Sequence, residues 1–441
     1  MINFPDSPAV NQTFTAAGVT WVWDGIKWNM SSIAGSPFIF ISTSPPANPT
    51  VGALWWDSIG GQLYIWFNDG SSTQWVSATN QGFGGTYLPL VGGNLSGPLR
   101  LAADPVIPLG AATKEYVDLV PTNYSLGSNR LINGDFLVTQ YGPNGTLNGF
   151  TADRWRLGMN QAGKLNWQVA GSAAMVPNGF PRCMSIVSLS AYTALATDSF
   201  CFYQTIEANF VSDFAWGTTG ARPVTLSFWV NVSIAGTYSG CISNYGPPAT
   251  RSYPFTFNAP VGWSKQIITI PGDAGGTWVN SGIGGSVYVT FDLGSGANYR
   301  GIANQWQNAG LNGVTGTVNI VANNGAVYQL VGIKLEIGSI ATPYNIESLS
   351  KRMSDCQRYF TLLTGLIVAG YNGAGQAVYG GYAFPSLMRA AATITFLNPI
   401  YSNSSNIIVA GQSVYGFYPG ITITATGMGY AQYGVTVNAE L

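Results

Sequence analysis

The sequence contains no histidine and few charged residues of either sign. Only 8% of its 441 residues are aspartate, glutamate, lysine or arginine, against about 25% in an average globular protein. The absence of histidine excludes Ser-His-Asp and Cys-His catalytic groups and histidine zinc sites. GxSxG, GxxxxGKS/T and CxxC motifs are also absent, which excludes the corresponding hydrolase, phosphate-binding and redox sites. We therefore expect a protein that is not an enzyme and that holds no cofactor and no metal ion.

Two further absences bear on where the protein works. No apolar run reaches the roughly 18–20 residues of a membrane-spanning helix, and the opening MINFPDSPAV has neither the basic region nor the apolar core of a secretory signal. The net charge of −1 gives no attraction for nucleic acid or anionic membranes. We expect synthesis in a cytoplasm, no membrane insertion and no nucleic-acid partner.

The residues that are present predict a mainly β protein. Apolar residues make up 46% of the chain and aromatic residues 13%, which argues against disorder. The 56 glycines, among many Thr, Ser and Asn residues, indicate strands separated by many turns. Because the four cysteines lie far apart without metal-ligand spacing, we expect buried free thiols. They are Cys183, Cys201, Cys241 and Cys356.

The first eighty residues contain half of the 14 tryptophans and follow one plan twice. Each half has an alternating aromatic strand, an Asp-Gly turn and a closing tryptophan: Trp21-Val-Trp23, Asp24-Gly25 and Trp28, then Tyr64-Ile-Trp66, Asp69-Gly70 and Trp75. An Asp-Gly pair between alternating apolar residues is a strong hairpin signal. We predict two small β modules, residues 1–35 and 36–84, whose tryptophans form the cores.

Residues 85–122 have too few apolar side chains for a core of their own. Ordering some thirty residues costs about 1.5 kcal/mol each, and burying about a dozen apolar side chains at about 2 kcal/mol each returns only half of that. Another surface has to supply the rest, and identical copies of the chain are the simplest source. We predict an extended stem ending in a short helix, with contacts between copies through Leu90, Leu95, Leu99, Leu101, Tyr116 and Leu119.

Two strings in this stem resemble the stem segment of bacteriophage tail fibres and short tail fibres. They are Leu90-Val-Gly-Gly-Asn-Leu-Ser-Gly-Pro-Leu99 and Gly110-Ala-Ala-Thr-Lys-Glu-Tyr-Val-Asp118. The resemblance implies a homotrimer in the tail of the virion, made in the cytoplasm of the host. It also implies that the N-terminal modules attach to tail or baseplate proteins. The distal β domains would then bind a bacterial surface glycan or an outer-membrane protein.

Residues 130–345 contain a series of strand candidates separated by turn clusters. They are Leu165–Val169, Phe200–Ile206, Val224–Val232, Lys265–Ile270, Ser286–Leu293, Val318–Val321 and Val327–Ile337. The repeat of a parallel β-helix is absent, so a jelly-roll β-sandwich fits better. Asn133-Gly-Asp-Phe136, Asp153-Arg-Trp155 and Ala341-Thr-Pro-Tyr344 resemble motifs of the carbohydrate-binding-like jelly rolls of phage fibres.

Several side chains of this domain are candidates for a site. Sugars bind to aromatic ring faces and hydrogen-bonding groups, and the aromatic candidates are Trp278, Tyr288, Trp306 and Tyr299; ordinary packing within strands is the alternative for them. Asp135 and Asp153 are candidates for a structural calcium ion, although no DxD-type cluster accompanies them. Hydrolysis by two carboxylates needs no histidine, and its nominal candidates are Glu207, Asp273 and Asp292.

Residues 346–363 carry apolar side chains at heptad spacing, which predicts a helix that packs either on the jelly roll or against its own copies. These are Leu349, Met353, Cys356, Phe360 and Leu363. Residues 364–441 form the predicted C-terminal β tip, whose aromatic rings lie among small polar residues, as in recognition surfaces. We predict receptor binding through Tyr371, Tyr379, Tyr382, Tyr401, Tyr415, Phe417, Tyr418, Tyr430 and Tyr433. The alternative is that these rings form a core between copies.

The sequence as a whole predicts a structural virion protein that attaches a phage to its host. Two other functions stay open. One is a tailspike depolymerase that cleaves host polysaccharide, and the other is a structural fibre or decoration protein without a receptor role.

Overall fold

The computed structural model describes residues 2–33, 39–78, 128–171, 176–177, 179–246 and 250–441. Within the described residues the chain is mainly β, as predicted. It divides into two compact units, Met1–Arg100 and Leu101–Leu441. The six predicted stem contacts, from Leu90 to Leu119, lie outside the described residues, so they stay a prediction.

The first unit contains two small sheets. One consists of β1 (Thr13–Ala16), β2 (Val19–Trp23) and β3 (Trp28–Ile33), and the other of β4 (Ile39–Ser42), β5 (Leu54–Asp57), β6 (Gln62–Asn68) and β7 (Thr73–Ser77). Both Asp-Gly hairpins are confirmed, because β2 pairs with β3 and β6 with β7 around these turns. The carboxylates of Asp24 and Asp69 each accept two backbone N–H groups and so close the turns.

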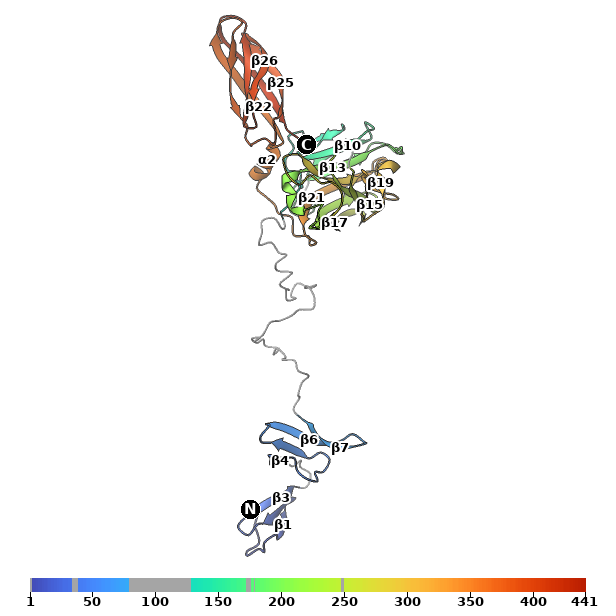
Figure 1. The fold of residues 1–441 in the computed structure, drawn as a ribbon, viewed down its shortest axis with the longest axis vertical. Helices are drawn as coiled ribbons and strands as arrows, with labels where there is room; N and C mark the ends of the chain where they lie inside the picture. Colours follow the sequence, from blue (N-terminus) through green and yellow to red (C-terminus); the bar gives the residue numbers. More distant parts are fainter. Residues whose placement is uncertain (1, 34–38, 79–127, 172–175, 178, 247–249) are drawn as a thin grey trace. The chain divides into compact units, whose positions relative to one another are not determined.

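The second unit begins with a β-sandwich of two six-stranded antiparallel sheets (Figure 1). Sheet I has the order β16 (Ser252–Ala259), β15 (Gly236–Asn244), β18 (Gly285–Asp292), β13 (Phe200–Glu207), β10 (Trp155–Met159) and β9 (Gly149–Phe150). Sheet II has the order β17 (Gly262–Ile270), β14 (Val224–Val232), β21 (Val327–Ile337), β12 (Cys183–Ser188), β11 (Leu165–Ala170) and β8 (Asn144–Gly145).

Aromatic rings fill the space between the two sheets. Phe228 of sheet II lies 5.1 Å from Phe257 and 5.0 Å from Phe291 of sheet I, between ring centroids. Burying each such ring stabilises the fold by about 1.5–3 kcal/mol. All four cysteines are buried free thiols, as predicted.

A long connection covers the outer face of β15. It contains η3 (Ala297–Tyr299), β19 (Arg300–Gly301) and β20 (Gly313–Val314), while η1 (Ala208–Phe210) and η2 (Ser212–Phe214) follow β13. The backbone N–H of Val314 donates to the Ser239 hydroxyl at 3.1 Å, and Thr317 lies 3.0 Å from the same hydroxyl. The strand predicted for Val318–Val321 is wrong, because Val318 and Val321 bond instead to backbone carbonyls of Thr237 and Leu293 as the chain turns.

Helix α2 (Leu349–Gln357) follows the sandwich. It is shorter than the helix predicted over 346–363, because Phe360 and Leu363 belong to strand β22, where they pair with Asn438 and Val435. The helix packs on its own sandwich: Arg352 forms an ion pair with Asp135, and both side chains are buried. Ser348 caps the helix by accepting the N–H of Lys351.

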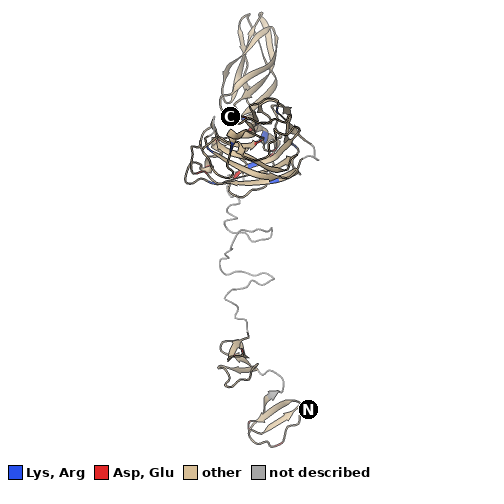
Figure 2. Ribbon diagram, turned by 90° about the vertical axis from the view of Figure 1, so that its right-hand side faces the viewer, with Lys and Arg blue, Asp and Glu red and all other residues tan. Residues whose placement is uncertain are grey.

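The C-terminal domain consists of two sheets that share a small core. One has the order β22 (Phe360–Asn372), β28 (Gly427–Asn438) and β25 (Thr393–Ser402). In the other, β27 (Gly416–Ile423) pairs with β23 (Ala377–Tyr379), β24 (Tyr382–Ala383) and β26 (Ser404–Gln412). The strands of this domain carry no Lys, Arg, Asp or Glu, which Figure 2 shows as uniform tan.

Candidate functional site

Five side chains, four from adjacent strands and one from the residue that follows a fifth strand, form a row across the outer face of sheet I. Because successive side chains of a strand point to opposite faces, Trp155 and Leu157 enter the core while Arg156 between them faces outward. Tyr203 of β13 and Tyr288 of β18 lie outward in the same way, between core residues. We call the five residues the aromatic row: Phe150, Arg156, Tyr203, Tyr288 and Tyr245.

Each member of the aromatic row contacts the next. The guanidinium carbon of Arg156 lies 4.7 Å from the Phe150 ring centroid and 5.8 Å from that of Tyr203. Tyr203 meets Tyr288 edge-to-face at 5.7 Å, and Tyr288 meets Tyr245 at 5.2 Å. Five strands at about 4.8 Å spacing give the row a length of about 19 Å, which exceeds that of a single sugar ring.

Two glycines make room for these rings. A Cβ atom on Gly285 would lie 2.5–2.8 Å from three atoms of the Tyr245 ring, and one on Gly158 would lie 3.1 Å from Tyr203 Cε1. The Tyr245 ring therefore lies flat on the backbone of β18. A ring in this position turns its other face away from the sheet, as a sugar-binding platform requires.

Tyr203 and Tyr288 stay neutral, and the three tyrosine hydroxyls of the row have no hydrogen-bond partner among the described residues. Burial raises the pKa of Tyr288 to about 12 and raises the pKa of Tyr203, with nearby Arg156 lowering both in part. Within the described residues none of the three hydroxyls, on Tyr203, Tyr288 and Tyr245, has a hydrogen-bond partner. Hydroxyls without partners among the described residues can exchange hydrogen bonds with the hydroxyls of a sugar.

Of the four aromatic candidates named from the sequence of this domain, Tyr288 alone belongs to the aromatic row. Trp278 is 9% exposed and packs with Trp306 on Trp216. Its indole N–H donates to Asp273 at 2.9 Å, and that of Trp306 donates to the Pro271 carbonyl at 3.1 Å. Both tryptophans therefore pack against neighbouring side chains, which is the alternative that the sequence left open for them. Tyr299 is half-buried in η3 and lies outside the aromatic row.

The acidic candidates of this domain are held by neighbouring polar groups. Asp273 pairs with Arg251 at 2.6 Å and Asp292 with Arg300 at 2.9 Å. Asp153 accepts both the backbone N–H and the side-chain amide of Gln140 at 2.6 Å. Among the described residues no three His, Cys, Asp or Glu side chains lie together as metal ligands would.

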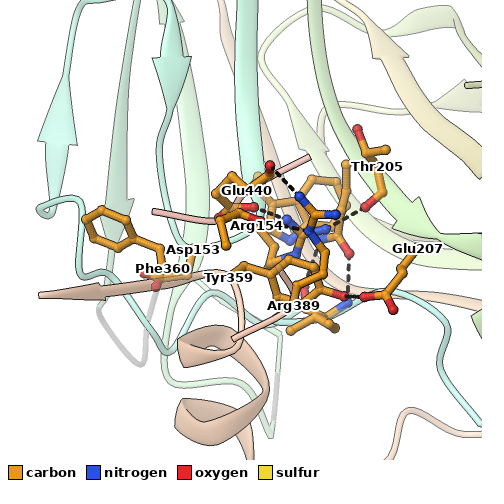
Figure 3. A network of polar contacts seen from close by, with 12 residues as sticks. Asp153, Arg154, Thr205, Glu207, Tyr359, Phe360, Arg389 and Glu440 are labelled. Carbon is orange, nitrogen blue, oxygen red and sulfur yellow. Dashed lines mark hydrogen bonds and ion pairs between the residues drawn. The ribbon is translucent and has the colours of Figure 1, made fainter. Parts of the chain in front are cut away.

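Glu207 belongs to a polar network that joins the sandwich to the C-terminal domain (Figure 3). It accepts the Tyr359 hydroxyl at 2.8 Å and a guanidinium N–H of Arg358 at 2.8 Å. Arg154 forms an ion pair with Glu440 and donates to the Thr205 carbonyl at 2.7 Å. This network fixes the C-terminal domain at the end of β13, on the strand that carries Tyr203.

Arg389 completes this junction in a way that the sequence did not specify. It donates to the backbone carbonyls of Ala439, Glu440 and Ile283, at 2.7, 3.1 and 2.6 Å. The arginine is half-buried, and it donates hydrogen bonds to carbonyl groups rather than to a carboxylate. It therefore ties the final residues of the chain to the sandwich loop before β18.

The nine aromatic residues predicted to bind a receptor fall into three groups. Phe417 and Tyr433 are 1% and 2% exposed and belong to the core of the C-terminal domain, so no ligand reaches them. Tyr382 is half-buried, stacks on Phe417 and bonds to the backbone of Ile367. The other six are exposed: Tyr371, Tyr379, Tyr401, Tyr415, Tyr418 and Tyr430.

Four of the exposed tyrosines form two pairs on the outer faces of different sheets. Tyr379 lies opposite Gly420, two residues from Tyr418 on the same face of β27. Tyr371 lies opposite Met428, two residues from Tyr430 on the same face of β28. Tyr401 accepts the N–H of Ile407, and Tyr415 lies in the turn before β27. Receptor binding by these six residues stays a prediction.

No protein-family model and no curated protein matches the sequence. Solved structures resemble about half of the chain. The enzymatically active domain of tailspike protein 4 from bacteriophage CBA120 is 13% identical over 48% of this chain and 21% of that one, with a TM-score of 0.27. The carbohydrate-binding module TmCBM61, solved with β-1,4-galactotriose, is 14% identical over 48% and 99%, with a TM-score of 0.25.

A family 11 carbohydrate-binding module from a cellulosomal cellulase of Clostridium thermocellum is similar to this chain at 10% identity. The match covers 44% of this chain and 95% of the module, with a TM-score of 0.23. TM-scores this low do not bear on what this chain binds. Among the described residues no helix has the length and apolar character needed to cross a membrane.

Proposed function

We propose that this chain is a homotrimeric tail fibre of a bacteriophage that attaches the virion to a bacterial surface glycan. The observation that carries the proposal is the aromatic row. Its five half-buried side chains lie outside the sandwich core and contact one another from β9 to the residue after β15, and its three tyrosine hydroxyls have no hydrogen-bond partner among the described residues. Ring faces combined with a few hydrogen-bonding groups are what sugar recognition uses.

Other parts of the chain support the same function. The stem strings around Leu95 and Tyr116 resemble those of trimeric tail fibres, and the N-terminal modules are small enough to serve as attachment points on the tail or baseplate. The paired tyrosines of the C-terminal domain lie on faces without charged side chains, which suits a glycan or an outer-membrane protein loop.

Weak single sites fit an attachment fibre. A shallow aromatic site binds with a dissociation constant of about 1 mM, or about −4 kcal/mol. Three copies per fibre and several fibres per particle raise the avidity by roughly 10²–10⁴ through effective concentration. Each site can then release its sugar while the particle stays attached.

The first test is binding of a fluorescently labelled full chain to a panel of bacterial strains. We expect labelling of some strains only, and a native mass near three times 46.7 kDa. The double variant Tyr203→Ala, Tyr288→Ala should lose labelling, whereas Ile267→Ala, an exposed apolar residue on sheet II, should keep it. A full chain that labels no strain would contradict the proposal.

The same panel separates the two candidate surfaces. If Tyr379→Ala combined with Tyr418→Ala abolishes labelling and the sandwich variant does not, the receptor site lies on the C-terminal domain. We propose no hydrolase activity, since Glu207, Asp273 and Asp292 each bond an arginine. New reducing ends in host polysaccharide incubated with the purified chain would contradict this and favour the depolymerase alternative.

A further inference from the structure

Arg156 differs from the other buried or half-buried arginines that the structure describes. Each of the others bonds a carboxylate or a backbone carbonyl: Arg130, Arg154, Arg251, Arg300, Arg352, Arg358 and Arg389. Arg156 has no oxygen partner in the described part of the chain; it lies between the rings of Phe150 and Tyr203. One of its donors, Nε, is buried without a hydrogen bond.

Two carboxylates in the electrostatic surroundings of Arg156 already form ion pairs with other arginines. The charge of Arg156 lowers the pKa of Glu440, but Glu440 forms its ion pair with Arg154. Asp292 raises the pKa of the Cys201 thiol and Arg156 lowers it, so both lie near this thiol. Asp292 forms an ion pair with Arg300. The groups that shift the pKa values of Tyr203 and Tyr288 include Arg156 and no carboxylate. The middle of the aromatic row is therefore positively charged.

We infer that Arg156 makes the aromatic row a site for acidic oligosaccharides, in which the guanidinium binds a carboxylate or phosphate group of the glycan. This inference rests on the proposed function and names the class of its ligand. A guanidinium is planar and offers paired N–H donors that match the two oxygens of such groups. Stacking on aromatic rings holds the plane of Arg156 without using these donors.

The position of Arg156 also fits this role. Tyr203, Tyr288 and Tyr245 follow Arg156 on one side, so a sugar bound to the guanidinium continues onto the tyrosines. Phe150 on the other side is already covered, because the Tyr141 ring stacks on it at 5.0 Å. The C-terminal domain offers no comparable cation, because its strands carry no charged side chain. The two surfaces would therefore differ in ligand, with acidic sugars on the sandwich.

The test uses the full chain and polysaccharide purified from a strain that it labels. Binding is measured to the native polysaccharide, to a sample with its carboxyl groups reduced to alcohols, and to a sample freed of phosphate. We expect roughly tenfold weaker binding to one of the two treated samples, the usual scale for one charge-assisted hydrogen bond. Which sample it is identifies the acidic group.

Variants then assign this difference to Arg156. Arg156→Gln should bind the native and the treated polysaccharide equally, and its binding should no longer weaken as salt rises. Arg156→Lys keeps the charge but not the paired donors, so it should retain the salt dependence with reduced affinity. Circular dichroism checks that each variant is folded.

The outcomes are distinct. If the wild type binds all three samples equally, or if Arg156→Gln still prefers the native one, this inference is overturned while the proposed function stands. If the full chain binds no polysaccharide from any labelled strain, both are overturned.

Discussion

The guanidinium carbon of Arg154 lies 3.6 Å from the ring centroid of Tyr359 (Figure 3). Arg154 directly precedes β10 of sheet I, and Tyr359 directly precedes β22, the first strand of the C-terminal domain. The same arginine forms an ion pair with Glu440, near the end of the last strand. One cation of the sandwich thus contacts both ends of the C-terminal domain.

Removal of Glu440 should loosen this junction. In Glu440→Gln, Arg154 remains buried without a carboxylate, and losing one partner of a buried pair costs about 3–5 kcal/mol. Urea unfolding of the full chain should show that the free energy of unfolding falls by about this amount. The matched control is Lys351→Gln, which breaks an exposed pair with Asp355 and should cost less than about 1 kcal/mol. Equal effects of the two changes would contradict a structural role for the junction.

Stability should depend on pH through Asp153. Burial raises its pKa from 3.8 to about 6, although hydrogen bonds from Gln140 partly oppose this. Because the folded-state pKa is the higher one, protonation favours the folded state: this contribution is fully present below about pH 4 and is lost as pH rises through 6. At about 1.4 kcal/mol per pKa unit it amounts to roughly 3 kcal/mol.

The Asp153→Asn variant tests this dependence. When the pH is lowered from 7 to 5, the melting temperature of the wild type should rise relative to that of the variant. The variant has no carboxyl group to protonate at this position. A difference between the two proteins that stays constant over this range would show that Asp153 does not titrate there.

The glycine beneath Tyr245 should be required for glycan binding. Gly285→Ala places a methyl group within 2.5 Å of the Tyr245 ring, so the ring must leave the row, and we expect binding to weaken by up to about tenfold. A Cβ on the adjacent Gly284 meets nothing within 4 Å, so Gly284→Ala should bind as the wild type does. Unchanged binding by Gly285→Ala would remove Tyr245 from the site.

The stem prediction can be checked by sedimentation. Leu95→Asp would place three charges near one axis of a trimer and should lower the trimer fraction, whereas Ser96→Asp adds the same charge at a polar neighbour and should not. Intact trimers of the Leu95→Asp variant would count against the assignment of Leu95 to the contact between copies.

Strands with a clear apolar pattern could be predicted from the sequence. Val224–Val232 and Val327–Ile337 have the predicted bounds because both lie in the middle of sheet II and are apolar along most of their length. Gly236–Asn244 was missed, since its Ser and Gly residues resemble a turn. It is nevertheless buried, because the connection containing Val314 and Thr317 covers its outer face.

The aromatic row could not be predicted in the same way. Its members stand at positions 150, 156, 203, 245 and 288, and only the pairing of β9, β10, β13, β18 and β15 aligns them. The alternation of Cys201 and Tyr203 with Phe200 and Phe202 was a usable signal for one outward ring. That Arg156 has no oxygen partner among the described residues depends on where every other charge lies, which no local pattern contains.

The position of β28 in its sheet has a consequence for biosynthesis. β28 lies between β22 and β25 and pairs with both, yet it is the last of the three to leave the ribosome. Strands β22 and β25 therefore have no partner in this sheet until β28 has been synthesised. We expect a premature stop between the end of β25 and residue 427 to leave β22 and β25 with unpaired edges, which would make the truncated chain a target for chaperones or proteases.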